Sequence, residues 1–120
     1  MLKETGERRD LYSFAQAECI ARERLMSKLS ETQCHSYVVN DAFTEIGVSG
    51  VRYLIRKNRP TLAFRYSEEF DWSRPLCALC LHPLGYYKGT WAGVMPPSDE
   101  MLTHLLYIRS DEHFFWKKAN

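Results

Sequence analysis

Cys77 and Cys80 are separated by two residues, and His82 follows two positions later. This spacing brings two sulfurs and one imidazole within reach of a single ion, and these are donors that zinc prefers in tetrahedral sites. A tetrahedral site needs four donors, yet no second pair of closely spaced cysteines follows along the chain. The sequence therefore predicts a zinc site in which three donors lie close together in the chain and the fourth comes from a distant residue.

The remaining donor of such a site has to come from elsewhere in the chain. Cys34 is the first candidate, and His35, His104 and His113 are the alternatives. The predicted ligand set, with zinc as a structural ion, is Cys77, Cys80, His82 and Cys34. Two ordinary thiols and a redox-active pair remain alternative interpretations of the same spacing.

A second group of residues with chemical potential lies between positions 51 and 66, a stretch without acidic residues. Its cations are Arg52, Arg56, Lys57, Arg59 and Arg65. Aromatic residues such as Phe64 lie between them, and such rings stack on bases while cations contact phosphates. A two-stranded ribbon with these residues would fit a DNA major groove. Nucleic acid, DNA rather than RNA, is the predicted partner, and an acidic protein surface or a solvated charged edge is the alternative.

The elements that must position these residues begin with a predicted helix over residues 8–30. Apolar residues recur there at spacings of three, four and seven, at Leu11, Phe14, Ala21, Leu25 and Leu29. The charged residues between them have mixed signs, which is typical of a solvated helix face.

The middle of the chain has a period of two, which predicts a sheet over residues 35–67. Segments 51–56 and 62–66 alternate in this way, and residues 57–60 suit a hairpin loop because Pro60 stays outside the strand ladder. Residues 35–39 are expected to add a third strand.

A helix-turn-helix is the competing prediction for residues 42–52, because Gly47-Val48-Ser49 is typical of the turn in that motif. Phe43 lies where that motif needs a small residue, and Gly50 would weaken its second helix. The hairpin is therefore favoured over the helix-turn-helix.

Residues 72–97 are expected to form an irregular module around the cysteines, because proline and glycine recur along them. Aromatic side chains are frequent anchors at protein interfaces. The predicted partner-binding residues of this module and of the chain end are Trp72, Tyr86, Tyr87, Trp91 and Trp116. Packing into the core is the alternative role for such aromatic residues.

The sequence predicts C-terminal helices over residues 98–118. Ser98, Asp99 and Glu100 resemble a helix start with a capping residue and two acids in the first turn. The triplet at 110–112 repeats this signal before a short last helix or a docked tail.

Length and composition narrow the class of protein. A chain of 120 residues is expected to form one domain. Its apolar runs are too short to span a bilayer, and its N-terminus lacks an apolar signal core. We therefore expect a cytoplasmic protein whose cysteines stay reduced.

Catalysis finds little support in the sequence. It contains no glycine-rich phosphate loop, no paired catalytic carboxylates and no zinc-protease spacing. The side chains of Cys34 and His35 would point to opposite faces of a strand, so they do not form a nucleophile and base. We expect a protein that is not an enzyme.

Taken together, the sequence predicts a small α+β domain, which contains an N-terminal helix, a short antiparallel sheet with the basic hairpin, the cysteine module and C-terminal helices. The predicted function is transcription regulation through DNA binding, with a structural zinc. The alternative is an adaptor or inhibitor that docks on a larger machine such as the transcription apparatus.

Overall fold

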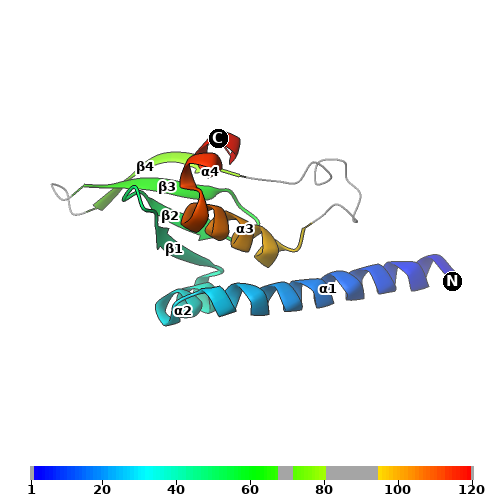
Figure 1. The fold of residues 1–120 in the computed structure, drawn as a ribbon. Coiled ribbons are helices and arrows are strands. Elements are labelled where there is room, and N and C mark those ends of the chain that lie inside the picture. The colour runs from blue at the N-terminus through cyan, green and yellow to red at the C-terminus, as the bar shows by residue number, and fades with distance from the viewer. Residues whose placement is uncertain (1, 68–71, 81–94, 120) are drawn as a thin grey trace.

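A computed structural model describes the backbone of residues 2–67, 72–80 and 95–119, and within these the side chains of residues 13–65, 76–80 and 95–119. The elements in chain order are α1 (Leu2–Lys28), α2 (Glu31–Asn40), β1 (Ala42–Ile46), β2 (Arg52–Arg56), β3 (Thr61–Ser67), β4 (Trp72–Leu79), α3 (Pro97–Ser110) and α4 (Glu112–Ala119). The strands form an antiparallel sheet in the order β1-β2-β3-β4. Helices α3 and α4 lie on one face of it (Figure 1). The predicted α+β fold of one compact domain is confirmed.

Two tight turns set the register of the first three strands. Gly50 has a φ of 89°, which glycine adopts at little cost, and its N–H donates to Gly47 O in the turn between β1 and β2. Asn58 has a φ of 59° in the turn between β2 and β3. Pro60 precedes β3, as the sequence predicts for a residue without an N–H to give to the ladder. The hairpin expected from the alternating pattern is therefore present.

Strand β4 pairs with β3 through an irregular register. Ala63 pairs with Cys77 but Phe64 pairs with Pro75, so one extra residue, Leu76, bulges from β4. Proline is tolerated at such a position because β4 lies at the edge of the sheet. The bulge explains why a proline interrupts a segment that nevertheless forms a strand.

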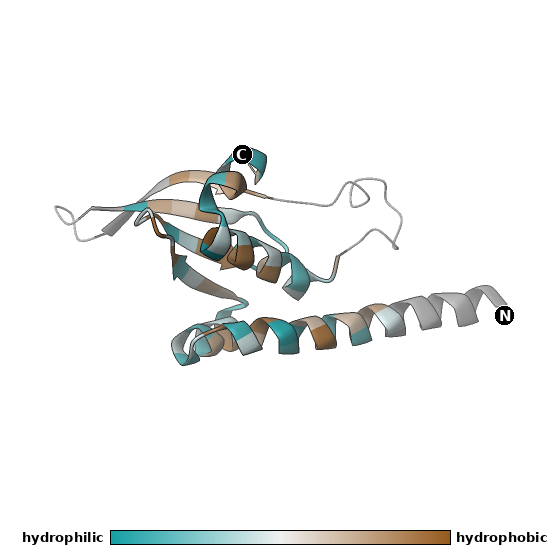
Figure 2. Ribbon diagram, viewed as in Figure 1, coloured by the Kyte–Doolittle hydropathy of each residue, from teal (hydrophilic) through white to brown (hydrophobic). Residues whose placement is uncertain are grey.

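The core lies between the sheet and the C-terminal helices. The inward side chains of the strands include Phe43, Tyr53 and Ile55, which are fully buried. Apolar residues of α3 and α4 pack on them: Met101, Leu105, Ile108 and Phe115. Figure 2 shows apolar ribbon segments in the helices and strands that face each other. One face of the sheet is therefore covered by helices.

The helix ends follow local chemistry. Pro96 is the N-cap of α3 and Pro97 opens the helix, where a missing N–H costs nothing. Ser98 thus lies in the first turn rather than at the expected capping position. Helix α4 begins at Glu112, and Asp111 Oδ1 accepts a hydrogen bond from Phe114 N at 3.1 Å. The predicted short last helix is present, but Ser110 ends α3 and Asp111 is the residue that precedes α4.

Two sequence expectations about local structure are wrong, and the competing helix-turn-helix, which the sequence already disfavours, is excluded as well. Residues 35–39 lie in α2 and not in a strand, because a capping box of Ser30 and Gln33 starts a helix just before them. The helix-turn-helix over residues 42–52 is excluded, because that segment contains strand β1. Residues 72–79 are strand β4 and not a loop, while residues 81–94 of the expected module lie outside the described part of the chain.

Candidate functional site

The face of the sheet opposite α3 and α4 carries a regular set of side chains. Arg52, Leu54 and Arg56 alternate along β2 with the buried Tyr53 and Ile55, so they point away from the helices. The register places further outer-face residues beside them: Thr44 and Ile46 of β1, and Leu62 and Phe64 of β3. We call these seven residues the outer face. None of the side chains that the structure describes in this set is acidic.

The outer face combines apolar and cationic groups. Arg52 is exposed and lies opposite Phe64 in the register, and Leu54 lies opposite Leu62. A hollow of about 250 Å³ lies here, bordered by Ile46, Arg52, Leu54 and Phe64 among others. The ring of Phe64 is half-buried, so this face offers a partly accessible aromatic ring next to an arginine.

The predicted basic residues do not all share this face. Arg52 and Arg56 belong to it, and the Arg56 guanidinium also donates to Pro60 O at 2.9 Å and 3.0 Å. Arg59 is exposed in the turn, where Lys57 Nζ lies 3.7 Å from the carboxylate of Glu18.

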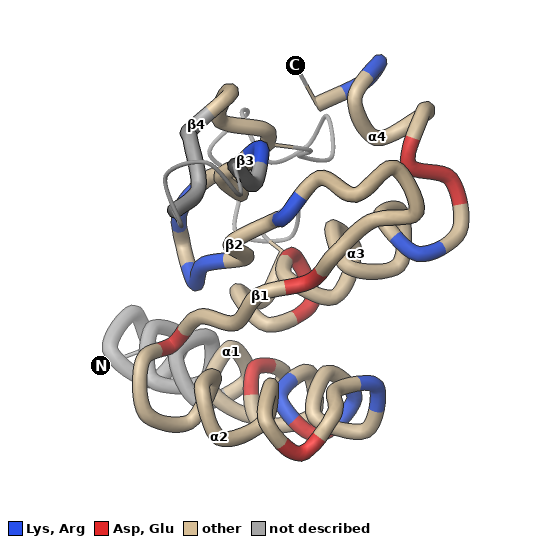
Figure 3. Tube along the Cα trace, turned by 90° about the vertical axis from the view of Figure 1, so that its left-hand side faces the viewer, with Lys and Arg blue, Asp and Glu red and all other residues tan. Residues whose placement is uncertain are grey.

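Arg65 lies apart from the other predicted cations. Alternation after Phe64 directs its side chain to the other side of the sheet, beside Gly50 and Val51. Figure 3 shows blue segments on β2 and β3, with α3 on the side of the sheet away from the outer face. The hairpin also lies inside the sheet, between β1 and β4, so it is not a free two-stranded ribbon.

A second site lies on the covered side of the sheet, where β4 ends. Cys80 Sγ, a carboxylate oxygen of Glu100 and a ring nitrogen of His104 lie within 4.8 Å of one another. Glu100 and His104 are 7% and 1% exposed as whole residues, which places these two donors inside the protein. These three residues, which we call the Cys80 cluster, could hold a metal ion.

The Cys80 cluster is positioned by its neighbours. Glu100 and His104 are four residues apart on α3 and therefore lie on the same face of that helix. Cys80 N donates to Ala119 O at 3.1 Å, which ties the end of β4 to the end of α4. Thr61, fully buried, places its Oγ1 2.7 Å from Nδ1 of His104.

The electrostatics of the cluster favour a protonated thiol when no cation is near. Burial, followed by the charge of Glu100, raises the pKa of Cys80 to about 11. The Cys80 thiol donates to Glu100 Oε1 over 3.7 Å. A divalent cation would reverse this balance, because a coordinated thiol loses its proton.

The structure distributes the predicted metal ligands differently from the sequence expectation. Cys34 lies in α2, where its Sγ donates to Met26 O at 3.4 Å. Cys77 lies on β4 opposite Ala63 and packs against the core, and burial raises its pKa. Among the predicted ligands that the structure describes, only Cys80 belongs to the Cys80 cluster. The fourth predicted ligand, His82, is not among the described residues.

His104 is one of the alternative donors expected from the sequence, whereas Glu100 was not expected to be one. The sequence indicates for Glu100 only a place among the acids in the first turn of a helix. The available signal was the spacing of four residues between Glu100 and His104 on a predicted helix, since both side chains then point the same way.

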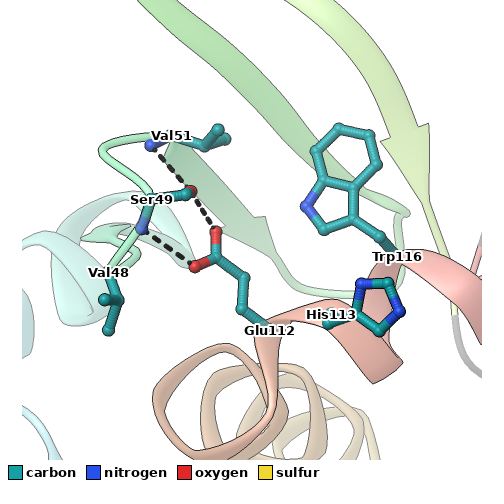
Figure 4. Close-up of a pocket in the computed structure, with 6 residues that line it drawn as sticks. All are labelled: Val48, Ser49, Val51, Glu112, His113 and Trp116. Atoms are coloured by element: carbon teal, nitrogen blue, oxygen red, sulfur yellow. Dashed lines mark hydrogen bonds between the residues drawn. The ribbon is translucent and has the colours of Figure 1, made fainter.

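A second hollow, of about 520 Å³, lies between the turn that joins β1 to β2 and helix α4 (Figure 4). It is bordered by Val48, Ser49, Val51, Glu112, His113 and Trp116. The Glu112 carboxylate is already engaged, since it accepts hydrogen bonds from Ser49 N at 3.1 Å and Ser49 Oγ at 2.6 Å. The hollow is therefore mainly an apolar depression.

The predicted partner-binding aromatic residues are described only in part. Trp116 is half-buried against the core, and its Nε1 donates to Tyr53 OH at 2.7 Å. Trp72 begins β4, but its side chain lies outside the described set, and Tyr86, Tyr87 and Trp91 lie in residues that are not described. These contacts within the protein favour a packing role for Trp116 over a role as an exposed residue that binds a partner.

Comparison with protein-family models, with curated proteins and with solved structures gave no match. Within the described residues, none of the helices is both long enough and apolar enough to cross a membrane.

Proposed function

We propose that this protein is a small regulator without catalytic activity that binds single-stranded nucleic acid on the outer face. The observation that supports this most directly is the position of Arg52 opposite Phe64, with Arg56 further along the same strand, on a side of the sheet that α3 and α4 leave open. The described side chains of this face include no carboxylate that would repel phosphate.

The chemistry of the outer face suits a strand whose bases are unpaired. A base stacked on an aromatic ring such as Phe64 contributes about 1–3 kcal/mol, and arginines contact the phosphates. Arg52 and Arg56 are four residues apart on one strand, which separates them by about 13 Å. A nucleic-acid backbone running along β2 can therefore contact both arginines, with a base stacked on Phe64 beside Arg52.

The sheet topology favours single-stranded over duplex nucleic acid in this proposal. Strands β1 and β4 flank the hairpin, so the sheet is too wide to enter a major groove as a two-stranded ribbon would. Open sheets recognise splayed bases instead. The proposed ligand is therefore a single strand instead of the duplex DNA expected from the sequence. The preference for DNA over RNA, the role in transcription and the cytoplasmic location stay predictions.

The proposal includes a zinc ion, which the Cys80 cluster would bind. A sulfur, an imidazole and a carboxylate are the donor types that zinc combines. The cluster lies on the helix-covered side of the sheet, away from the outer face, so the ion would support the fold and would not contact the nucleic acid.

The test is fluorescence anisotropy of a labelled oligothymidylate at several salt concentrations. We expect the double variant Arg52→Gln and Arg56→Gln to bind at least tenfold more weakly, with a log–log salt slope reduced by about 1.4, because two phosphate contacts are lost. The matched control changes two exposed cations elsewhere, Lys28→Gln and Lys117→Gln, and should retain affinity.

Three outcomes would contradict the proposal. Unchanged affinity of the outer-face variant for the oligonucleotide would show that Arg52 and Arg56 do not bind it. An equal loss of affinity in the control variant would show that only the net charge of the protein matters. Tighter binding of a duplex of the same length would overturn the choice of single strands. Circular dichroism of both variants checks that they fold.

The adaptor alternative retains one specific observation. Val38, Val39 and Val48 are 57%, 64% and 94% exposed, and exposed apolar side chains are common in protein interfaces. A pull-down from nuclease-treated lysate separates the alternatives, because an adaptor keeps its partner after nucleic acid is removed. Retention of one stoichiometric protein partner together with no oligonucleotide binding would favour the adaptor.

A further inference from the structure

We infer that Cys80, Glu100 and His104 bind one Zn²⁺ as protein ligands, and that the ion fastens the end of β4 to α3. This deepens the zinc part of the proposed function and replaces the ligand set expected from the sequence. It does not depend on nucleic-acid binding, since the cluster and the outer face lie on opposite sides of the sheet.

The spacing of the donors fits a tetrahedral ion. Zinc with a sulfur at about 2.3 Å and an oxygen at about 2.1 Å holds these two donors about 3.6 Å apart. Cys80 Sγ and Glu100 Oε1 lie 3.7 Å apart, and all three donors lie within 4.8 Å of one another. Cys80 and Glu100 thus already have the separation of two donors on one tetrahedral ion, and a His104 ring nitrogen lies within 4.8 Å of both.

Two elements distant in sequence create this arrangement. Leu79 pairs with Thr61, so Cys80 follows directly after the last paired residue of β4. Glu100 and His104 occupy adjacent turns of α3 on one face of that helix. An ion shared by them would connect the edge strand of the sheet to the helix that covers its core.

Thr61 supplies the supporting contact expected around a metal-binding histidine. When Nε2 of His104 binds the ion, the proton of the ring is on Nδ1. This N–H then donates a hydrogen bond to Thr61 Oγ1, which lies 2.7 Å from Nδ1. Such contacts fix the tautomer and the ring orientation, and their loss typically weakens metal affinity 10–100-fold. Thr61 is thus a positioning residue for the site.

The donor types select zinc among the common cations. Mg²⁺ and Ca²⁺ bind oxygen ligands, whereas a thiolate and an imidazole favour Zn²⁺. The burial of Glu100 and His104 favours a structural ion, because substrate has little access to it. Water or a further donor takes the fourth tetrahedral position.

Metal analysis of the whole purified chain tests the inference. The protein is stripped with chelator, reconstituted with zinc, and analysed by mass spectrometry for zinc per chain. A parallel sample with Co²⁺ is examined for the sulfur-to-cobalt charge-transfer absorption and the intense visible bands of tetrahedral cobalt. We expect one ion per chain and both spectral signatures.

Variants then identify the ligands. Cys80→Ser and Glu100→Gln should each lower zinc affinity at least tenfold, and Cys80→Ser should abolish the sulfur-to-cobalt band. Cys34→Ser and Cys77→Ser are matched controls that remove a thiol elsewhere and should keep both. Thr61→Val should weaken zinc 10–100-fold, whereas Thr44→Val on the outer face should not change it.

Clear results would overturn the inference. Wild-type protein that takes up no zinc and shows no cobalt–sulfur band would do so without any variant, as would loss of zinc in Cys77→Ser with retention in Cys80→Ser. A protein that binds oligonucleotide normally but takes up no zinc overturns the metal site alone. The reverse result overturns only the nucleic-acid proposal.

Discussion

Glu112 shows how one side chain can hold a turn in place. Its carboxylate accepts hydrogen bonds from Ser49 N, Ser49 Oγ and Tyr53 OH, and Trp116 Nε1 donates to the same tyrosine oxygen. Gly47 permits this approach, because a Cβ at that position would collide with the Glu112 carboxylate. The turn between β1 and β2 is thereby fastened to the start of α4.

The same contacts make stability depend on pH. Burial opposes ionisation of Glu112, but the hydrogen bonds from Ser49 and Tyr53 outweigh it and hold its pKa below the ordinary value of 4.5. A carboxyl with a lowered pKa stabilises the fold above its unfolded-state pKa, and this contribution is lost as pH falls through the folded-state value. We expect Glu112→Gln to lower the free energy of unfolding by about 1 kcal/mol at pH 7.

Urea unfolding at pH 7 and at pH 3 checks this prediction. The difference between wild type and Glu112→Gln should shrink in acid, where the wild-type carboxyl is protonated as well. Glu23→Gln, at an exposed position of α1, is the control and should change stability little at either pH. A difference that stays constant between the two pH values would contradict the assigned pKa direction.

At the scale of elements, α2 shows how a local cap decides between helix and strand. Ser30 Oγ accepts a hydrogen bond from Gln33 N at 3.2 Å, and Gln33 Oε1 accepts one from Ser30 N at 3.0 Å. Val38 and Val39, which suggested a strand, are exposed on the helix surface, while Tyr37 is fully buried. The cap and one buried tyrosine outweigh the β propensity of two valines.

Removing the cap should weaken this helix measurably. Ser30→Ala is expected to lower stability by about 1 kcal/mol, the usual effect of losing a serine N-cap. Ser27→Ala in α1 is the matched control, because Ser27 Oγ only donates to Arg24 O of its own helix and alanine favours helix. Thermal unfolding compares the two variants, and an equal effect of both would show that the cap contributes nothing.

At the scale of the whole molecule, Glu18 joins three parts of the chain. Its carboxylate accepts hydrogen bonds from Ser98 N at 2.8 Å and Ser98 Oγ at 2.7 Å, and Lys57 Nζ lies 3.7 Å away. Tyr37 OH lies 2.5 Å from the same serine oxygen. Helix α1, the first turn of α3 and the turn after β2 thus meet at one carboxylate.

Loss of that carboxylate should loosen both helices together. We expect Glu18→Gln to reduce stability by about 2 kcal/mol, because two charge-assisted hydrogen bonds are weakened. Amide hydrogen exchange should become faster in residues 13–25 of α1 and at the start of α3. Glu31→Gln, an exposed acid on α2, serves as the control, and faster exchange confined to α1 would exclude the coupling to α3.

The sequence by itself determined the elements whose pattern is local. Alternation over residues 51–67, the apolar period of the first helix and the acids before α4 identified the hairpin and the terminal helices, because burial on one face imposes these periods. It also identified Cys80 as a thiol and His104 as an imidazole to consider as metal donors.

Only the tertiary structure decided which of these residues meet. Cys77 and Cys80 are neighbours in sequence, yet Cys77 pairs on β4 and packs in the core, while Cys80, just past the last paired residue, meets Glu100 and His104 of α3. The five cations form one run in sequence, but strand alternation directs Arg65 to the opposite side from Arg52. Strand pairing and helix packing join residues far apart in the chain, and neither is encoded in the spacing of a local motif.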